Sequence, residues 1–209
     1  MTDFAQRYGR WAVIAGASEG IGASLADQLA ALGMDLVLIA RNGPLLDEVA
    51  ARAREEHGVQ TRAVVQDLTD PDVGAKIADA TDGLDVGLLI YNAGASERTT
   101  PFLDNEIEYS LKQVALDCTA PITLAHHFGE AMVERGRGGI VLVASLACLA
   151  GSATLAMYSA VTPPRTCCPK TWPARSSRTS ETGRCTSSAR TTGPPRRRSG
   201  PSIDAHSSR

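Results

Sequence analysis

The chain has 209 residues, of which 43% are hydrophobic and 4% aromatic, and its formal net charge is −2. This length bounds it to one domain with or without an extension, and this hydrophobic share excludes a chain that is disordered throughout. Its five cysteines have neither zinc-site spacing nor the density of a disulfide framework, and we find no secretory signal, so we expect a reducing, cytoplasmic setting.

The predicted elements occupy the first part of the chain, where continuous apolar runs alternate with segments of helical period. We predict strands at 11–15, 36–40, 63–65, 84–91 and 140–144, and helices at 20–32, 45–57, 71–80, 107–135 and from 153 onward. The apolar stripe of the first helix is Ile21, Leu25, Leu29 and Leu32. This alternation predicts an α/β fold, a Rossmann-type doubly wound parallel sheet with helices on both faces.

The amino-acid composition of the chain changes abruptly near Val161. Residues 1–162 carry 11 basic and 21 acidic side chains, whereas residues 163–209 carry 10 basic and 2 acidic ones. The second segment also holds seven of the eleven prolines, and Ile203 is its only Leu, Ile, Val or Phe. Such a segment cannot bury enough apolar surface to offset its chain entropy. We therefore expect a C-terminally incomplete domain over residues 1–162 and a disordered basic tail over residues 163–209.

A glycine-rich loop joins the first predicted strand to the first helix. Glycines let the backbone approach a pyrophosphate, and the helix N-terminus offers free N–H groups and a positive dipole end. A glycine-rich turn without a ligand is the alternative, but the placement between strand and helix favours a dinucleotide. The residues that we expect to hold it are Gly16, Ser18, Gly20, Ile21 and Gly22.

The end of the second strand bears on the choice of cofactor. An acidic side chain there would bind the ribose hydroxyls, whereas an arginine accommodates a 2′-phosphate. This chain has Arg41 directly after Ala40, and Asp35 lies at the opposite end of the strand. The pattern favours NADP, with NAD as the alternative if Arg41 is only a solvated charge beside the next helix.

Polar residues follow the later strands at the same edge of the predicted sheet, where ligands of open α/β sheets bind. They are Asp67-Leu68, Asn92-Ala93-Gly94, and Ser145, with Tyr158 on the next helix. A serine hydroxyl and a tyrosine phenol at this edge can hold and protonate a carbonyl oxygen, so Ser145 and Tyr158 are acid–base candidates.

In this order the motifs resemble those of the short-chain dehydrogenase/reductase family, over residues 11–161 only. The resemblance implies a single-domain enzyme that moves hydride between NAD(P) and a small-molecule carbonyl or alcohol, commonly as a homo-oligomer. By this likeness Tyr158 is the general acid/base and Ser145 orients the carbonyl. Asn92-Ala93-Gly94 steadies the sheet edge beside the cofactor, and Asp67 contacts the adenine.

The chain departs from the family four residues after Tyr158. The family has a lysine there, one helical turn on, and this chain has Thr162 followed by Pro163. A cation about 4 Å from a tyrosine favours the phenolate by ~4 kcal/mol at a dielectric of ~20, so we expect impaired activity. A cofactor-binding pseudo-enzyme or a non-functional truncated product is the alternative. A second departure is Asp117, which occupies the place of a helix Asn thought to support a proton relay.

Two further classes of function are disfavoured. The nine arginines of residues 163–209 could bind nucleic-acid phosphates, but aromatic stacking partners are nearly absent, so we expect no specific nucleic-acid partner. Adjacent His126 and His127 cannot both face one metal from a helix, and we expect no metal site. The uncharged run 140–157 is better explained by a strand, a loop and a helix start than by a membrane span.

The tail has the composition of GC-rich DNA read out of frame. If the third base of each codon is read with the first two of the next, residues 167–173 can encode Leu-Leu-Ser-Glu-Asp-Leu-Ala. Residues 184–187 can similarly encode the strand-like run Leu-His-Val-Leu. We therefore hypothesise a frameshift near Val161, which affects the last 48 residues.

The hypothesis is tested by the nucleotide sequence across codons 155–170. We expect an insertion or deletion there, and the restored frame should supply the lysine after Tyr158. A clean reading frame as written would exclude a frameshift and make the chain a genuine truncated variant.

Overall fold

The computed structural model describes residues 3–94, 97–150 and 152–161. In this part of the chain, five parallel strands form one sheet in the order β3-β2-β1-β4-β5. The strands are β1 (Trp11–Ala15), β2 (Asp35–Ala40), β3 (Thr61–Val65), β4 (Val86–Tyr91) and β5 (Gly139–Leu142). The chain runs outward from β1 to β3 and then crosses to β4 and β5, so the strand order reverses between β1 and β4. This topology confirms the predicted Rossmann-type doubly wound sheet.

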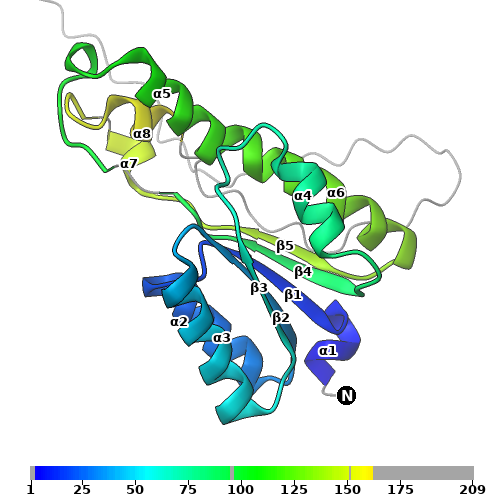
Figure 1. Cartoon of the computed structure of the whole chain (residues 1–209). Helices are drawn as coiled ribbons and strands as arrows, with labels where there is room; N and C mark the ends of the chain where they lie inside the picture. The colour runs from blue at the N-terminus through cyan, green and yellow to red at the C-terminus, as the bar shows by residue number, and fades with distance from the viewer. Residues whose placement is uncertain (1–2, 95–96, 151, 162–209) are drawn as a thin grey trace, which may run out of the picture. The chain divides into compact units, whose positions relative to one another are not determined.

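Helices cover both faces of the sheet (Figure 1). One face packs against α1 (Asp3–Tyr8), α2 (Gly20–Ala31) and α3 (Gly43–His57), and the other against α4 (Val73–Ala80) and α6 (Ala120–Arg135). Along β1, Ala12 and Ile14 join the first core, whereas Val13 and Ala15 join the second. Because both faces are buried, the strands read as unbroken apolar runs rather than as alternating ones.

The ends of α3 follow from local chemistry. The Asn42 side chain accepts a hydrogen bond from the backbone N–H of Leu45 at 3.3 Å, and Pro44 stands in the first turn, where its missing N–H costs nothing. The helix ends at Gly58, whose φ of +68° is the left-handed conformation that glycine adopts most readily.

The predicted helix at 107–135 is interrupted. It consists of α5 (Ile107–Val114), a π-helical segment η2 (Ala115–Thr119) and α6. A π turn adds a residue to the helical repeat and re-aims the side chains within it. The short elements α1, η1 (Phe102–Asp104) and α7 (Ala147–Ala150) were not predicted, while α8 (Ala156–Val161) starts close to the predicted position.

The predicted apolar stripe of α2 is partly wrong. The helix buries Gly22, Ala26, Leu29 and Ala30, whereas Ile21 and Leu32 are exposed. Close approach decides this, because a Cβ built on Gly22 would lie 1.9 Å from the carbonyl oxygen of Gly16. A side chain larger than that of glycine therefore does not fit at position 22, and the neighbouring Ile21 is exposed.

The sequence predicts that the run 140–157 does not cross a membrane and that the folded domain ends at residue 162. None of the helices within the described ranges is long and apolar enough to cross a membrane. The predicted boundary at residue 162 and the tail of residues 163–209 lie outside the described residues.

The contact between α1 and β4 leaves no room at Gly87, where an added Cβ would lie 1.1 Å from the Tyr8 carbonyl oxygen. We expect Gly87→Ala to displace α1 and to lower the free energy of unfolding by about 1–3 kcal/mol, measured by urea denaturation. The matched control is Gly129→Ala within α6, where the nearest atom to the added Cβ is Ile140 Cδ1 at 3.8 Å. The control should be neutral or stabilising, and equal losses in both variants would contradict the prediction.

Candidate functional site

A cavity of about 570 Å³ opens where β4 and β5 end. Polar groups from several elements meet in it, namely Asn92, Asp117, Ser145 and Tyr158. Ile21 and Leu142 are among its apolar walls. The cavity therefore combines apolar surface with a few convergent polar groups, which is typical of small-molecule sites.

The structure gathers some of the predicted site residues in this cavity and leaves others along the same sheet edge. Those that line it are Ile21, Asn92, Ala93, Gly94, Ser145 and Tyr158. The remaining predicted residues follow the ends of β1, β2 and β3, and are Gly16, Ser18, Gly20, Gly22, Arg41, Asp67 and Leu68. Their roles in binding or catalysis stay predictions.

The glycine loop is held against the end of β4. The Asn92 side chain donates from Nδ2 to the carbonyl oxygen of Gly16 at 3.1 Å, and the Gly16 N–H donates to the Ile39 carbonyl at 2.8 Å. Gly16 has a φ of +82°, and a Cβ there would lie 2.7 Å from the backbone nitrogen of Ala93. Glycine is thus required at this position both by conformation and by contact.

The N-terminus of α2 has the features of an anion site. The Glu19 side chain at the N-cap makes no capping hydrogen bond, and Gly20 has open space within 4 Å of the position of its Cβ. The first N–H groups of a helix have no partner within the helix, and its dipole favours an anion at that end. Half-buried Ser18 lies in the same loop. These residues fit the pyrophosphate of a dinucleotide.

Arg41, which follows β2, lies near the carboxylates of Glu97 and Asp67. Arg41 Nη2 lies 2.9 Å from Glu97 Oε1, and this hydrogen bond raises the pKa of Arg41, with a further contribution from the charge of Asp67. The Asp67 side chain accepts hydrogen bonds from the N–H and hydroxyl of Thr69, both at 2.9 Å. Leu68 is buried in the core, so only its backbone can contact a ligand at this edge.

Ser145 follows β5 and stands at the start of α7. Its Oγ accepts a hydrogen bond from the backbone N–H of Ala147 at 3.2 Å, and this contact fixes the position of the hydroxyl. Because that bond uses an oxygen lone pair, the hydroxyl proton can be donated to a ligand. Tyr158 of α8 is half-buried and lines the same cavity.

Asp117 reaches the cavity from η2, and sequence reasoning identified it only as a departure from a family pattern. Burial raises the pKa of its carboxyl, while a hydrogen bond donated by Gln113 Nε2 opposes that shift. A Cβ built on Gly94 would lie 2.6 Å from Asp117 Oδ1, so the glycine lets β4 and η2 meet. The signal that could have identified Asp117 is the π turn, which the sequence pattern does not reveal.

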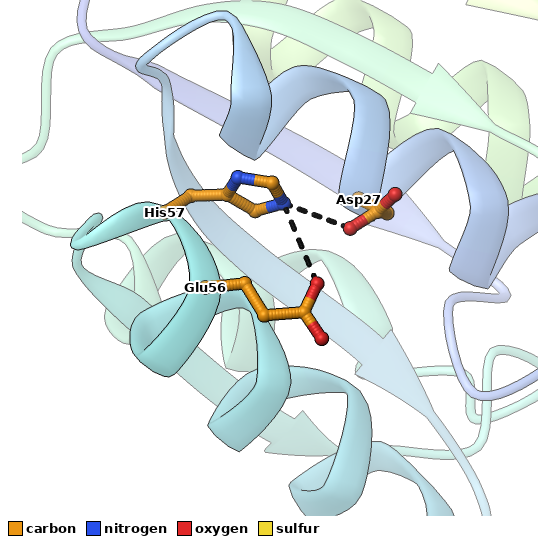
Figure 2. Close-up of side chains that lie close together, drawn as sticks. All are labelled: Asp27, Glu56 and His57. Atoms are coloured by element: carbon orange, nitrogen blue, oxygen red, sulfur yellow. Dashed lines mark hydrogen bonds and ion pairs between the residues drawn. The ribbon is translucent and has the colours of Figure 1, made fainter.

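A group of side chains of the kinds that can ligate a metal lies between α2 and α3, on one face of the sheet (Figure 2). Asp27 of α2 meets Glu56 and His57 of α3, with ligand atoms within 4.8 Å of one another. His57 Nε2 lies 2.8 Å from Asp27 Oδ1 and 4.0 Å from Glu56 Oε2. These side chains form a contact between α2 and α3. Within the described ranges, nothing else at this place indicates a bound ion.

The chain is similar in sequence to known proteins. A model of the short chain dehydrogenase family matches residues 10–161. The chain is 34% identical over 158 residues to a very-long-chain 3-oxoacyl-CoA reductase of Bos taurus, which covers 73% of this chain and 50% of that protein. The chain thus spans about half the length of the curated relatives that it matches.

Solved structures show the same likeness. A 7beta-hydroxysteroid dehydrogenase superposes with a TM-score of 0.72 at 28% identity, over 75% of this chain and 60% of that one. A short-chain dehydrogenase from Sphingobium yanoikuyae, in complex with NADPH, superposes with a TM-score of 0.68 at 35% identity, over 73% and 60%.

The burial of Asp117 predicts a pH-dependent effect of Asp117→Asn. Because the pKa of this carboxyl is raised on folding, its ionisation costs folding free energy as the pH rises above the ordinary carboxyl pKa of about 3.9. The asparagine cannot ionise and can still accept from Gln113. Thermal melts should therefore show a higher Tm for the variant at pH 7, and the difference should vanish at the acid end of the range.

The control is Asp104→Asn in η1, since Asp104 is exposed to solvent. Its Tm should follow that of the parent chain at every pH. A Tm gain for Asp117→Asn that does not depend on pH would contradict the prediction.

Proposed function

The chain belongs to the short-chain dehydrogenase family. From this premise we propose that it binds NADP(H) and transfers hydride, with impaired efficiency, between this cofactor and a small-molecule carbonyl or alcohol. The observation that carries the proposal is the cavity at the ends of β4 and β5, where Ser145 and Tyr158 meet Asn92 beside the glycine loop.

The residues along the sheet edge would hold the cofactor. The N-terminus of α2 and the loop from Gly16 to Gly22 fit the pyrophosphate, and Arg41 offers a bidentate cation to a 2′-phosphate. Asp67 and the backbone of Leu68 lie at the neighbouring strand end, where an adenine would be placed. Bound NADPH would supply the hydride.

The protein side chains would manage the oxygen of the substrate. In the reducing direction, Ser145 donates a hydrogen bond to the carbonyl oxygen, which polarises the carbonyl group. Tyr158 gives its phenolic proton to the same oxygen as the hydride reaches the carbon, so the product is an alcohol and the tyrosine becomes a phenolate. Thr162 offers no positive charge to stabilise that phenolate. This substitution is the basis for proposing impaired turnover, and a restored reading frame would supply the missing lysine.

A cofactor-binding pseudo-enzyme is the second candidate. Thr162 and Pro163 favour it, because a proline disfavours helical geometry at the residue before it and no cation follows Tyr158 at the usual spacing. Under either candidate, the family resemblance supports a homo-oligomer and the cysteine usage supports a cytoplasmic location.

The two candidates differ in turnover. We expect NADPH to bind in a calorimetric titration, and slow NADPH oxidation with a panel of ketones. Thr162→Lys combined with Pro163→Ala should raise kcat by about 100-fold, the scale of a restored acid–base group.

The control is Tyr158→Phe, which keeps the ring and removes the proton. If that variant binds NADPH as the parent does and the slow turnover is lost, Tyr158 is the acid. Turnover that is absent in both, with NADPH bound, identifies the pseudo-enzyme, and failure to bind NADPH or NADH would overturn the proposed function.

A further inference from the structure

An ion pair joins the end of β2 to the loop that follows β4. Nη2 of Arg41 lies 2.9 Å from Oε1 of Glu97, and the two side chains are 66% and 65% exposed. The partners are separated by 56 positions in the sequence, so the contact is created by the fold at the switch point between the two halves of the sheet.

Two carboxylates act on the Arg41 guanidinium. The hydrogen bond to Glu97 is the largest cause of its raised pKa, partial burial opposes the shift, and the charge of Asp67 adds to it. Glu97 therefore occupies one N–H group of the fork, and Asp67 adds a second negative charge from the end of β3. The side chain that suits a 2′-phosphate is thus already paired with a carboxylate of the protein.

The contact between Arg41 and Glu97 affects which cofactor is preferred. We propose, on the basis of the proposed function, that Glu97 sets the preference between NADP(H) and NAD(H) by competing with the 2′-phosphate for the guanidinium of Arg41. A carboxylate and a phosphate bind the same planar fork, and they repel each other when they are brought to it together. A 2′-phosphate that binds through Nη2 of Arg41 must displace Glu97 from that group, whereas NAD(H) carries no group that needs this exchange.

The size of the effect follows from exposure. The Arg41–Glu97 pair is open to solvent, and exposed ion pairs contribute little free energy. Breaking this contact to admit the 2′-phosphate therefore weakens NADPH binding by up to about fivefold. Repulsion between the carboxylate and the phosphate adds to this factor at low ionic strength. The competition therefore adjusts the preference without abolishing NADPH binding.

The experiment is a calorimetric titration of the full chain and its variants with NADPH and with NADH at low salt. Glu97→Gln keeps the shape of the side chain and removes its charge. We expect it to lower the Kd of NADPH by about three- to tenfold and to leave the Kd of NADH within about twofold.

The chain offers a matched control in Glu106→Gln. Glu106 pairs with Arg98 at 2.7 Å, and its side chain is 69% exposed, so the variant changes the net charge equally without touching Arg41. Neither cofactor should respond to it. In an Arg41→Gln background, Glu97→Gln should have a smaller effect on the Kd of NADPH, because the competition for the guanidinium is gone and only repulsion of the 2′-phosphate remains.

The remaining outcomes separate the two proposals. If the parent chain binds NADPH and Glu97→Gln behaves as Glu106→Gln does, or shifts NADPH and NADH equally, the role of Glu97 is overturned and the proposed function stands. If the parent and Glu97→Gln have native circular dichroism spectra and neither binds NADPH or NADH, the proposed function fails, and the role of Glu97 fails with it.

Discussion

The close approach of the glycine loop to the end of β4 is the constraint on which the rest of the site depends. Asn92 donates its amide N–H to the carbonyl oxygen of Gly16, and Gly22 faces that same oxygen with no room for a Cβ. These contacts bring β1, α2 and β4 together at the point where the strand order reverses. Ile21, in the first turn of α2, is thereby placed on the wall of the cavity.

The sheet supports this constraint through burial on both faces. Alternate residues of the central strands belong to two separate cores, one under α2 and α3 and the other under α4 and α6. Side chains of β1, β2 and β4 are almost fully enclosed, so the strand ends cannot shift without opening one core or the other. The polar residues that follow these strands are held at a rigid edge, which is where a ligand must find its partners already placed.

The sequence predicts what depends on local pattern and misses what depends on contact between distant segments. Continuous apolar runs predicted every strand of the described sheet within a few residues, and the glycine spacing predicted the loop. The π turn at η2 was missed because its neighbours read as an uninterrupted helix, and with it the burial of Asp117. The Arg41–Glu97 pair was missed because nothing local relates a residue after β2 to one after β4. The buried face of α2 was predicted in part, since the size of side chains along a helix does not show where a backbone must come close.

The residues proposed to bind the cofactor and those proposed to transfer the proton come from different parts of the chain. The glycine loop, Asn92 and Arg41 are positioned by contacts among β1, β2, α2 and β4, which do not involve α8. In the proposed function, proton transfer would instead use Ser145 and Tyr158, with Thr162 at the position of the family's lysine, and all three come after β5. A change confined to the second group removes charge stabilisation from the phenolate and leaves the loop, the switch point and the Arg41–Glu97 contact as they are. The contacts that would hold a cofactor are therefore separate from the residues that would carry out proton transfer in the proposed function.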